Sequence, residues 1–336
     1  MLTKPLLALY SLAHFWVDLS CAFLAFRTLS ASPDFALCLL LYNFCAFALQ
    51  MPLGLLADRF DRNSVLAAAG CGLVALAFAV PLPLPAAVTA GLGNALFHLG
   101  GGIDTLNVCQ RKAAALGVFI SPGALGLYLG TLWGKGSSVP QWIAPFFLIL
   151  LTFAIVWLSH RAFGSLRSGN APFDLSGTFP PLFPLFLVVV LRSYMGMNQS
   201  FSWKTGGWAV AVTAALVLGK AAGGFLMDRT SPRIASLLSL GGAALLYLFS
   251  GFPPAGTLAV FLFNMTMPVT LWAVAKVLPG AKGFTFGLLT FALFLGYLPS
   301  WLGWPSLLTS PWAYGAVSLL SLALLWLPFK KELTLC

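Results

Sequence analysis

The stretch Gly54-Leu55-Leu56-Ala57-Asp58-Arg59 returns later in the chain as Gly224-Phe225-Leu226-Met227-Asp228-Arg229. Every residue of the second copy stands 170 positions after its counterpart, which is close to half of the 336 residues. The same offset relates four further pairs of identical residues: Asn94 and Asn264, Lys112 and Lys282, Gly117 and Gly287, and Gly126 and Gly296. Matches in one register indicate that the chain is a tandem duplication of one structural unit.

The composition is that of a membrane protein. Hydrophobic residues make up 60% of the chain and charged residues only 8%, against about 25% charged residues in an ordinary soluble domain. This excludes a soluble enzyme, a disordered tail and a nucleic-acid partner. The net charge of +10 is spread thinly along apolar sequence, so we attribute it to membrane topology rather than to DNA binding.

Apolar runs broken by Gly, Pro and charge predict an all-α polytopic protein with twelve transmembrane helices, each needing about 20 residues. They leave no room for a catalytic domain outside the membrane. The runs group into a six-helix bundle at 1–159, a cytoplasmic linker at 160–179 and a second six-helix bundle at 180–336. The predicted spans are 5–27, 34–56, 64–82, 85–108, 112–134, 141–159, 180–200, 206–227, 233–251, 255–276, 283–303 and 309–329.

Basic residues fix the predicted orientation. With both termini in the cytoplasm, 13 of the 18 Lys and Arg residues fall in cytoplasmic loops or termini and 3 fall on the opposite side. Positive charge concentrates on the cytoplasmic side of membrane proteins. We therefore expect cytoplasmic termini and a location in a bacterial inner (plasma) membrane.

The repeated G-x-x-x-D-R pattern suits a gate. Its Gly lets two helices approach closely, and its Asp can pair with a base or cap the N-terminus of a neighbouring helix. The Arg stays at the headgroup surface. Such a contact can hold one face of a transporter closed and release it.

The first copy, extended to Gly54-x-x-x-Asp58-Arg59-x-Asp61-Arg62, resembles the loop 2–3 signature of the major facilitator superfamily, and the copy at 224–229 is similar to the weaker repeat of that signature. The first copy departs from the family pattern at Asp61, where a Gly is usual, and at Asn63, where a base is usual. The resemblance implies two six-helix bundles around a central cavity and alternating access. It assigns the gating motif to Gly54, Asp58, Arg59, Arg62, Gly224, Asp228 and Arg229.

Shorter motifs are similar to those of the fosmidomycin-resistance-type exporters. His14-Phe15-Trp16-Val17-Asp18 is similar to their H-F-x-x-D start, and Phe97-His98 to their F-H-P segment, with Leu99 in place of Pro. The stretch 117–126 is similar to the antiporter motif of the predicted fifth span, with Ser121 replacing a Gly. This resemblance implies proton-coupled export. The stripe Gly126, Gly130 and Gly134 in the same span is more typical of tight helix packing than of a ligand site.

Ionisable residues within the predicted spans of the first half are candidates for carrying a proton, because a charge at the bilayer centre costs at least about 2.5 kcal/mol. His14 and Asp18 are four residues apart and share a helix face. They form either a structural pair or a protonation site. His98 is either a hydrogen-bonded core residue or a further protonation site. Asp104 is either part of the same pathway or a partner for Arg111 or Lys112.

Basic residues without acids mark the second half. Arg192 and Lys220 lie inside predicted spans, and the only acid between Asp174 and Glu332 is Asp228. Arg recognises carboxylates and phosphates through two hydrogen bonds, so we expect Arg192 and Lys220 to bind an anionic or zwitterionic solute. A structural bridge from Asp18 to Arg192 is the alternative. Further candidates for the substrate cavity are Asn43, Asn94, Tyr194, Asn264 and Trp272.

Neither a metal nor a cofactor is expected, since the six cysteines show no metal-ligand spacing. No paired carboxylates, HExxH or Ser/His/Asp arrangement indicates an enzyme. We expect a monomeric secondary transporter that couples a small-molecule substrate to protons, with the exporter-like motifs favouring export. Proton-coupled uptake, an uncoupled facilitator and a non-transporting receptor or scaffold remain alternatives.

Overall fold

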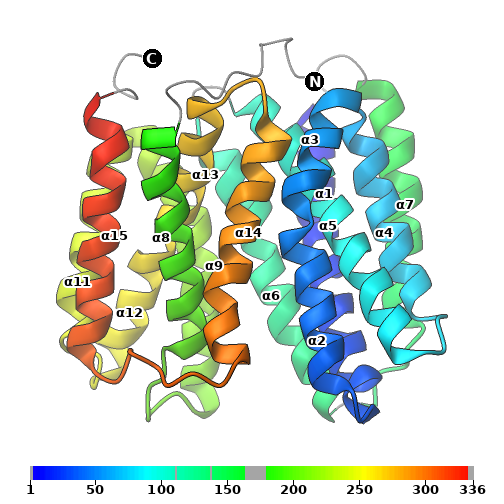
Figure 1. The fold of residues 1–336 in the computed structure, drawn as a ribbon, viewed down its shortest axis with the longest axis horizontal. Coiled ribbons are helices and arrows are strands. Elements are labelled where there is room, and N and C mark those ends of the chain that lie inside the picture. The colour runs from blue at the N-terminus through cyan, green and yellow to red at the C-terminus, as the bar shows by residue number, and fades with distance from the viewer. Residues whose placement is uncertain (1–2, 110–111, 137, 163–178, 332–336) are drawn as a thin grey trace. The chain divides into compact units, whose positions relative to one another are not determined.

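The computed structural model describes residues 3–109, 112–136, 138–162 and 179–331. Most of the predicted linker 160–179 lies outside the described residues. Within them, the secondary structure consists of helices that run up and down (Figure 1). The elements are α1 (Thr3–Arg27), η1 (Leu29–Ala31), α2 (Phe35–Asn43), η2 (Phe44–Ala48), α3 (Gln50–Phe60), α4 (Asn63–Ala77), α5 (Pro83–Val108), α6 (Ala114–Gly136), α7 (Ile143–Ala162), α8 (Phe179–Asn198), α9 (Gly206–Arg229), α10 (Pro232–Ser236), η3 (Leu237–Gly241), α11 (Gly242–Tyr247), α12 (Pro253–Asn264), α13 (Thr266–Val277), α14 (Lys282–Trp301) and α15 (Pro311–Lys331).

Several of these elements are parts of one continuous helix. The π-helical turn η2 joins α2 to α3, η3 joins α10 to α11, and Met265 keeps helical backbone angles between α12 and α13. With η1 counted as an extension of α1, the described elements form twelve helical segments. Nine of them are long and apolar enough to cross a membrane. The other three, α4, α5 and α10–α11, coincide with the predicted spans 64–82, 85–108 and 233–251, and the number of twelve spans stays a prediction.

Two residues between helices explain where α3 ends and where α10 begins. Asp61 adopts the left-handed conformation with φ of 46° directly after α3 and ends that helix. Ser231 caps α10 by accepting a hydrogen bond from the backbone N of Ile234 at 3.2 Å, and Pro232 occupies the first helical position, where its missing N–H costs nothing.

The chain divides into two compact units. Unit 1 consists of Met1–Val108, Pro122–Ala171 and Gly280–Phe291, and unit 2 of Cys109–Ser121, Pro172–Pro279 and Ala292–Cys336. The first turns of α6 therefore belong to unit 2, and the first half of α14 belongs to unit 1.

Unit 1 is held together by closely packed helices. Helix α4 packs against α5 and α7, while α1 packs against α5, α7 and the glycine stripe of α6. A Cβ at Gly126 would lie 2.1 Å from the Phe15 carbonyl oxygen, and one at Gly130 would lie 2.1 Å from that of Leu19. This close approach confirms that the stripe serves helix packing, and it fixes the segment of α1 that carries His14 and Asp18.

Unit 2 packs in the same manner. Helix α9 contacts α12 and α13, α8 contacts α13 and α15, and α11 contacts α12 and α15. Gly219 and Gly223 of α9 abut the backbone of Phe261 and Met265.

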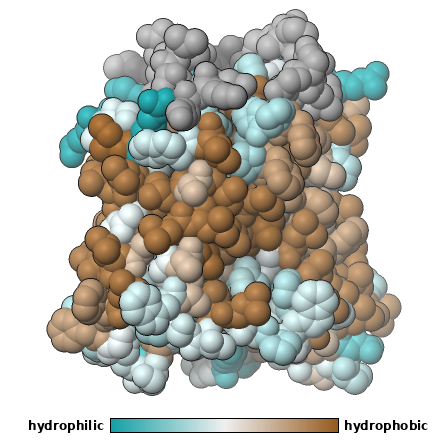
Figure 2. All heavy atoms as spheres, turned by 60° about the vertical axis from the view of Figure 1, so that its left-hand side comes forward, coloured by the Kyte–Doolittle hydropathy of each residue, from teal (hydrophilic) through white to brown (hydrophobic). Residues whose placement is uncertain are grey.

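On the face drawn in Figure 2, hydrophobic side chains form a band between two more hydrophilic ends, as expected of a surface in contact with lipid.

Candidate functional site

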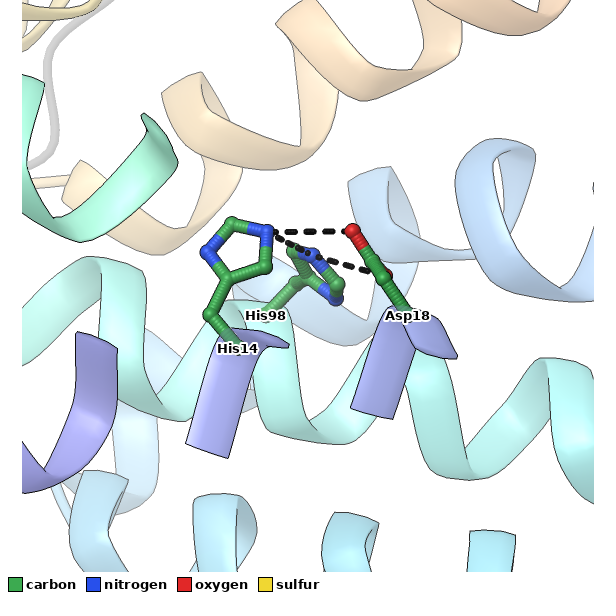
Figure 3. A group of neighbouring side chains, drawn as sticks. All are labelled: His14, Asp18 and His98. Carbon is green, nitrogen blue, oxygen red and sulfur yellow. Dashed lines mark hydrogen bonds and ion pairs between the residues drawn. The ribbon is translucent and has the colours of Figure 1, made fainter. Parts of the chain in front are cut away.

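Three ionisable side chains meet inside unit 1. His14 and Asp18 come from α1 and His98 comes from α5 (Figure 3). The Nε2 atom of His14 lies 3.3 Å from Asp18 Oδ2, and the Nε2 atom of His98 lies 2.9 Å from that of His14 and 3.7 Å from Asp18 Oδ1. The side chains of His14 and His98 are 7% and 12% exposed, and that of Asp18 is 21% exposed, so the cluster is almost buried but reachable from one side.

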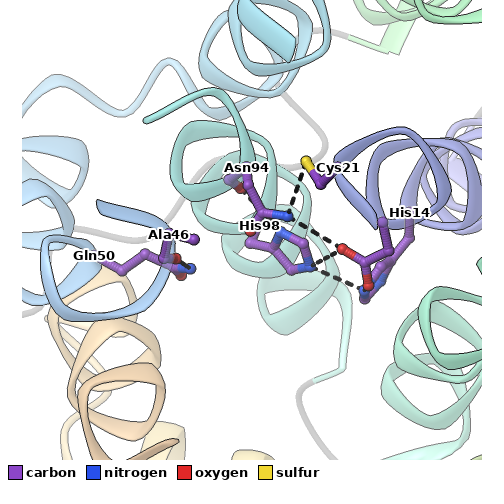
Figure 4. Close-up of polar contacts among 7 residues, drawn as sticks. His14, Cys21, Ala46, Gln50, Asn94 and His98 are labelled. Atoms are coloured by element: carbon purple, nitrogen blue, oxygen red, sulfur yellow. Dashed lines mark hydrogen bonds and ion pairs between the residues drawn. The ribbon is translucent and has the colours of Figure 1, made fainter. Parts of the chain in front are cut away.

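Asn94, one turn before His98 on α5, orients this cluster (Figure 4). Its Nδ2 donates a hydrogen bond of 3.1 Å to Asp18 Oδ1 and contacts Cys21 Sγ at 3.8 Å. Its backbone carbonyl accepts a hydrogen bond of 2.9 Å from His98 Nδ1. The side chain of Asn94, which the sequence predicts in the substrate cavity, lies against Asp18.

The hydrogen bond to Asn94 fixes one proton position. Because the Asn94 carbonyl can only accept, His98 Nδ1 carries a hydrogen, and in the singly protonated form of His98 the unprotonated Nε2 faces the cluster. A hydrogen on His14 Nε2 can be donated to His98 Nε2 or to Asp18. The arrangement therefore provides three basic atoms between which one proton can move. The same three side chains offer ligand atoms within 4.8 Å of one another, which is close enough to hold a metal ion.

Gly123 of α6 closes one side of the cluster. A Cβ at this position would lie 2.3 Å from His14 Nε2 and 2.5 Å from Asp18 Oδ2. Gly123 lies within the stretch 117–126 that is similar to the antiporter motif, and it is the residue of that stretch that meets the two α1 side chains.

Asp104 forms a separate pair. Its Oδ2 accepts a hydrogen bond of 2.6 Å from the hydroxyl of Tyr10, and the two residues are 3% and 0% exposed. The partners suggested by the sequence were Arg111, which lies outside the described residues, and Lys112, which is exposed. Nearby in sequence, Asn107 Oδ1 accepts a hydrogen bond of 2.8 Å from Lys282 Nζ.

Arg192 of α8 is the buried cation of unit 2. It is 8% exposed, and its Nη2 donates to the hydroxyls of Thr266 and Thr270 at 2.8 and 3.2 Å. Its Nε is buried without a hydrogen-bond partner among the described residues. The guanidinium thus retains a donor that faces no protein acceptor in the described part of unit 2.

The other residues expected in the substrate cavity make contacts of their own within their units. Asn43 and Asn264 donate to the carbonyls of their own helices at Leu39 and Val260, and the Tyr194 hydroxyl accepts from the backbone N of Leu307. Trp272 is 7% exposed, and its Nε1 has no hydrogen-bond partner in the part of the chain that the structure describes. Lys276 Nζ lies 5.7 Å from the centroid of the Trp272 ring. Lys220 is half-buried on α9.

Both copies of the repeated motif cap a helix. Asp58 accepts hydrogen bonds from the backbone N of Gly283 and Phe284 at 2.7 and 2.8 Å, at the start of α14. Asp228 accepts from Ala113 and Ala114 at 2.6 and 3.2 Å, at the start of α6. Capping is one of the two roles that the sequence predicts for the Asp, and both copies fill it. The remaining charged members of the motif, Arg59, Arg62 and Arg229, are exposed.

The glycines of the motif make these caps possible. A Cβ at Gly54 would lie 2.1 Å from the Gly283 carbonyl oxygen, and one at Gly224 would lie 2.5 Å from that of Ala113. The helices could not approach this closely with a larger residue.

Sequence reasoning missed three partners of the candidate residues: Tyr10, Thr266 and Thr270. Each is an ordinary core residue by pattern. The only available signal for the threonines was their spacing of four residues, which places both hydroxyls on one helix face.

No protein-family model matches the chain, and no curated protein matches it either. Several solved structures do match the chain. The chain is similar to the E. coli fucose:proton symporter FucP, with a TM-score of 0.65 and 13% identity over 98% of this chain and 99% of that chain. It is similar to the human organic anion transporter MFSD10, with a TM-score of 0.66 and 16% identity over 97% and 99%.

A third similar structure is a bacterial homologue of the iron transporter ferroportin, with a TM-score of 0.64 and 15% identity over 97% of both chains. Another structure of FucP is described as a major facilitator superfamily transporter in the outward conformation, and it matches with a TM-score of 0.67. The nine apolar helices of spanning length among the described residues, with these matches along almost the whole chain, make this an integral, multi-pass membrane protein. Its fold is that of the major facilitator superfamily transporters.

Proposed function

We propose that this protein is a secondary active transporter that moves a small anionic or zwitterionic solute by alternating access, coupled to protons. The fold supports the transporter class. The solute class rests on a single observation, the buried guanidinium of Arg192.

An anion is the partner that Arg192 lacks. A buried guanidinium is costly unless an acceptor satisfies its donors. Two threonine hydroxyls meet its Nη2, and its Nε is unpartnered. The only acid among the described residues of unit 2, Asp228, is engaged at Ala113 and Ala114. A carboxylate or phosphate on the solute would supply the missing charge and accept from Nε, in the paired geometry that Arg favours.

His14, Asp18 and His98 are the proposed proton carriers. The two imidazoles and the carboxylate lie within 3.7 Å of one another, so a proton can pass between them. Asn94 holds both Asp18 and His98 in position. The Asp104–Tyr10 pair is a second candidate on the same pathway, on α5 and α1.

Asp58 and Asp228 are the proposed gate. Each accepts hydrogen bonds from two backbone N–H groups at a helix start, where the helix dipole favours a negative charge. Breaking two such bonds at each site would release the first turns of α14 and α6. With the exposed Arg59, Arg62 and Arg229, these residues would form the cytoplasmic closure.

The proposed topology has twelve spans, cytoplasmic termini, bundles at 1–159 and 180–336 and a linker at 160–179. We propose a monomer in a bacterial inner membrane, and the exporter-like motifs favour export.

The test is solute flux into proteoliposomes that carry an imposed pH gradient, using a panel of organic anions chosen by thermal-shift screening. Arg192→Gln should abolish stabilisation by the anion and reduce its flux at least 10-fold, whereas Arg192→Lys should retain part of both. Arg161, an exposed arginine at the end of α7, provides the matched control Arg161→Gln. Anion stabilisation that persists in Arg192→Gln would refute the solute class. Solute counterflow that ignores pH would favour an uncoupled facilitator.

A further inference from the structure

We propose that His14, Asp18 and His98 form a binding site for a single divalent transition-metal ion of the Zn²⁺ class. Two imidazole nitrogens and one carboxylate, drawn from two helices, are the ligand set on which this proposal rests. Metal binding is independent of the proposed transport function, and only its effect on flux rests on that function.

The spacing of the ligand atoms suits such an ion. Zn²⁺ lies about 2.0–2.2 Å from nitrogen and carboxylate ligands, which places two ligands of a tetrahedral site about 3.3 Å apart. In the cluster the two Nε2 atoms are 2.9 Å apart, His14 Nε2 is 3.3 Å from Asp18 Oδ2, and His98 Nε2 is 3.7 Å from Asp18 Oδ1. One ligand atom from each of the three side chains lies within 4.8 Å of the other two, so rotation of the side chains can bring these atoms to the spacing that an ion requires.

The surroundings of the ligands are those of a metal site. A metal-bound histidine usually donates its second ring N–H to a carbonyl or carboxylate, which fixes its tautomer. His98 does this through Nδ1 to the Asn94 carbonyl, so that its bare Nε2 faces His14 and Asp18. Asn94 also donates to Asp18 Oδ1, as ligating carboxylates are commonly held.

The site has an open side and a constrained one. Asp18 is 21% exposed on its side chain, so an ion and a completing water have access. Gly123 also faces the cluster, and a Cβ there would lie 2.3 Å from His14 and 2.5 Å from Asp18. The space beside the ligands therefore depends on the absence of a side chain at position 123.

Three protein ligands with one open position resemble the sites that keep a water on the metal. Imidazole and carboxylate together select Zn²⁺, Co²⁺ or Ni²⁺ over Ca²⁺ and Mg²⁺, which prefer oxygen alone. A bound ion would occupy the atoms between which the proton moves. If the cluster carries the coupling proton, added Zn²⁺ should then inhibit flux.

The experiment is a Co²⁺ titration of the purified full-length protein in detergent, followed by the visible absorption of the ion, without solute or pH gradient. We expect one saturable ion per chain with a tetrahedral spectrum and no sulfur charge-transfer band. Zn²⁺ should displace it, and excess Mg²⁺ should not. The variants His14→Gln, His98→Gln and Asp18→Asn should each weaken binding at least about 10-fold, the lower end of what loss of a metal's supporting residues costs.

The third histidine of the chain, His160, supplies the matched control, because it is exposed at the end of α7. His160→Gln should bind as the wild type does. A second test removes no ligand: Gly123→Ala should weaken Co²⁺ binding, whereas Gly72→Ala, whose nearest neighbour is 4.0 Å away, should not. The melting temperatures of the metal-free variants show whether each is folded.

A titration with no saturable Co²⁺ in folded wild-type protein overturns the proposal, as does wild-type affinity in His98→Gln. If Co²⁺ binds as expected while flux ignores pH, the metal site stands and the proton role fails. If binding is absent while flux follows the pH gradient, the proton role stands and the metal site fails.

Discussion

Asp228 repeats, 170 positions later, the contact that Asp58 makes. Asp58 binds the backbone N of Gly283 and Phe284, and Asp228 binds that of Ala113 and Ala114. The Asp of each half therefore caps the start of a helix that the sequence assigns to the other half. This arrangement also explains why the start of α14 belongs to unit 1 and the start of α6 to unit 2.

Removing either cap should destabilise the protein. Asp58→Ala and Asp228→Ala each leave two backbone N–H groups without their acceptor, and loss of a helix cap costs about 0.5–2 kcal/mol. We expect a lower melting temperature for both variants in thermal unfolding. Asp34→Ala is the control, since Asp34 precedes α2 without a side-chain cap bond. A wild-type melting temperature in both cap variants would contradict a stabilising role.

The close approach at the motif glycines gives a second prediction. Gly54→Ala and Gly224→Ala place a methyl group within 2.5 Å of a backbone carbonyl oxygen. Overpacking of this kind costs about 1–3 kcal/mol, so both variants should melt earlier. Gly196→Ala on α8 meets nothing within 4 Å and should be neutral or stabilising, because Ala favours a helix by about 0.5–1 kcal/mol over Gly. Equal melting temperatures in all three variants would show that the helices at Gly54 and Gly224 accommodate a methyl group without loss of stability.

Asp18→Asn tests the proton role. The substitution keeps the size of the side chain and an acceptor for Asn94 but removes the charge and the exchangeable proton. We expect wild-type proteoliposomes to accumulate or release solute faster under a pH gradient, and the variant to show no such response. Solute exchange at equal pH should persist in Asp18→Asn, because it needs no net proton movement. Gradient-driven flux at the wild-type rate in this variant would disprove the proton role of Asp18.

A double-mutant cycle on Tyr10 and Asp104 measures their buried hydrogen bond. Tyr10→Phe leaves the Asp104 carboxyl oxygen without its donor, and an unsatisfied buried group costs about 1–3 kcal/mol. Asp104→Leu leaves the Tyr10 hydroxyl unsatisfied in turn. The double variant should lose less stability than the two single losses added together. Strict additivity in denaturant unfolding would mean that the 2.6 Å contact contributes nothing.

Much of the fold could be predicted, because membrane helices follow from local composition. An apolar run of spanning length must be helical in lipid to satisfy its backbone, and the α1, α6 and α9 segments illustrate this. The two π-helical turns, η2 and η3, could not be predicted, since their sequences are as apolar as the helices around them. The sequence marks Asp61 as a departure from the family motif but does not predict that it ends α3.

What the sequence by itself determined was periodic or repeated. The spacing of His14 and Asp18 places them on one helix face, and the 170-residue offset identified Gly54, Asp58 and their copies. Only the tertiary structure decided which distant groups these residues meet. His98 joins the α1 pair across 84 positions, Asp58 reaches Gly283 across 225, and Arg192 meets Thr266 across 74. The physical reason is that hydropathy fixes that a helix spans the membrane, whereas helix rotation and close packing at glycines such as Gly123 fix which side chains face one another.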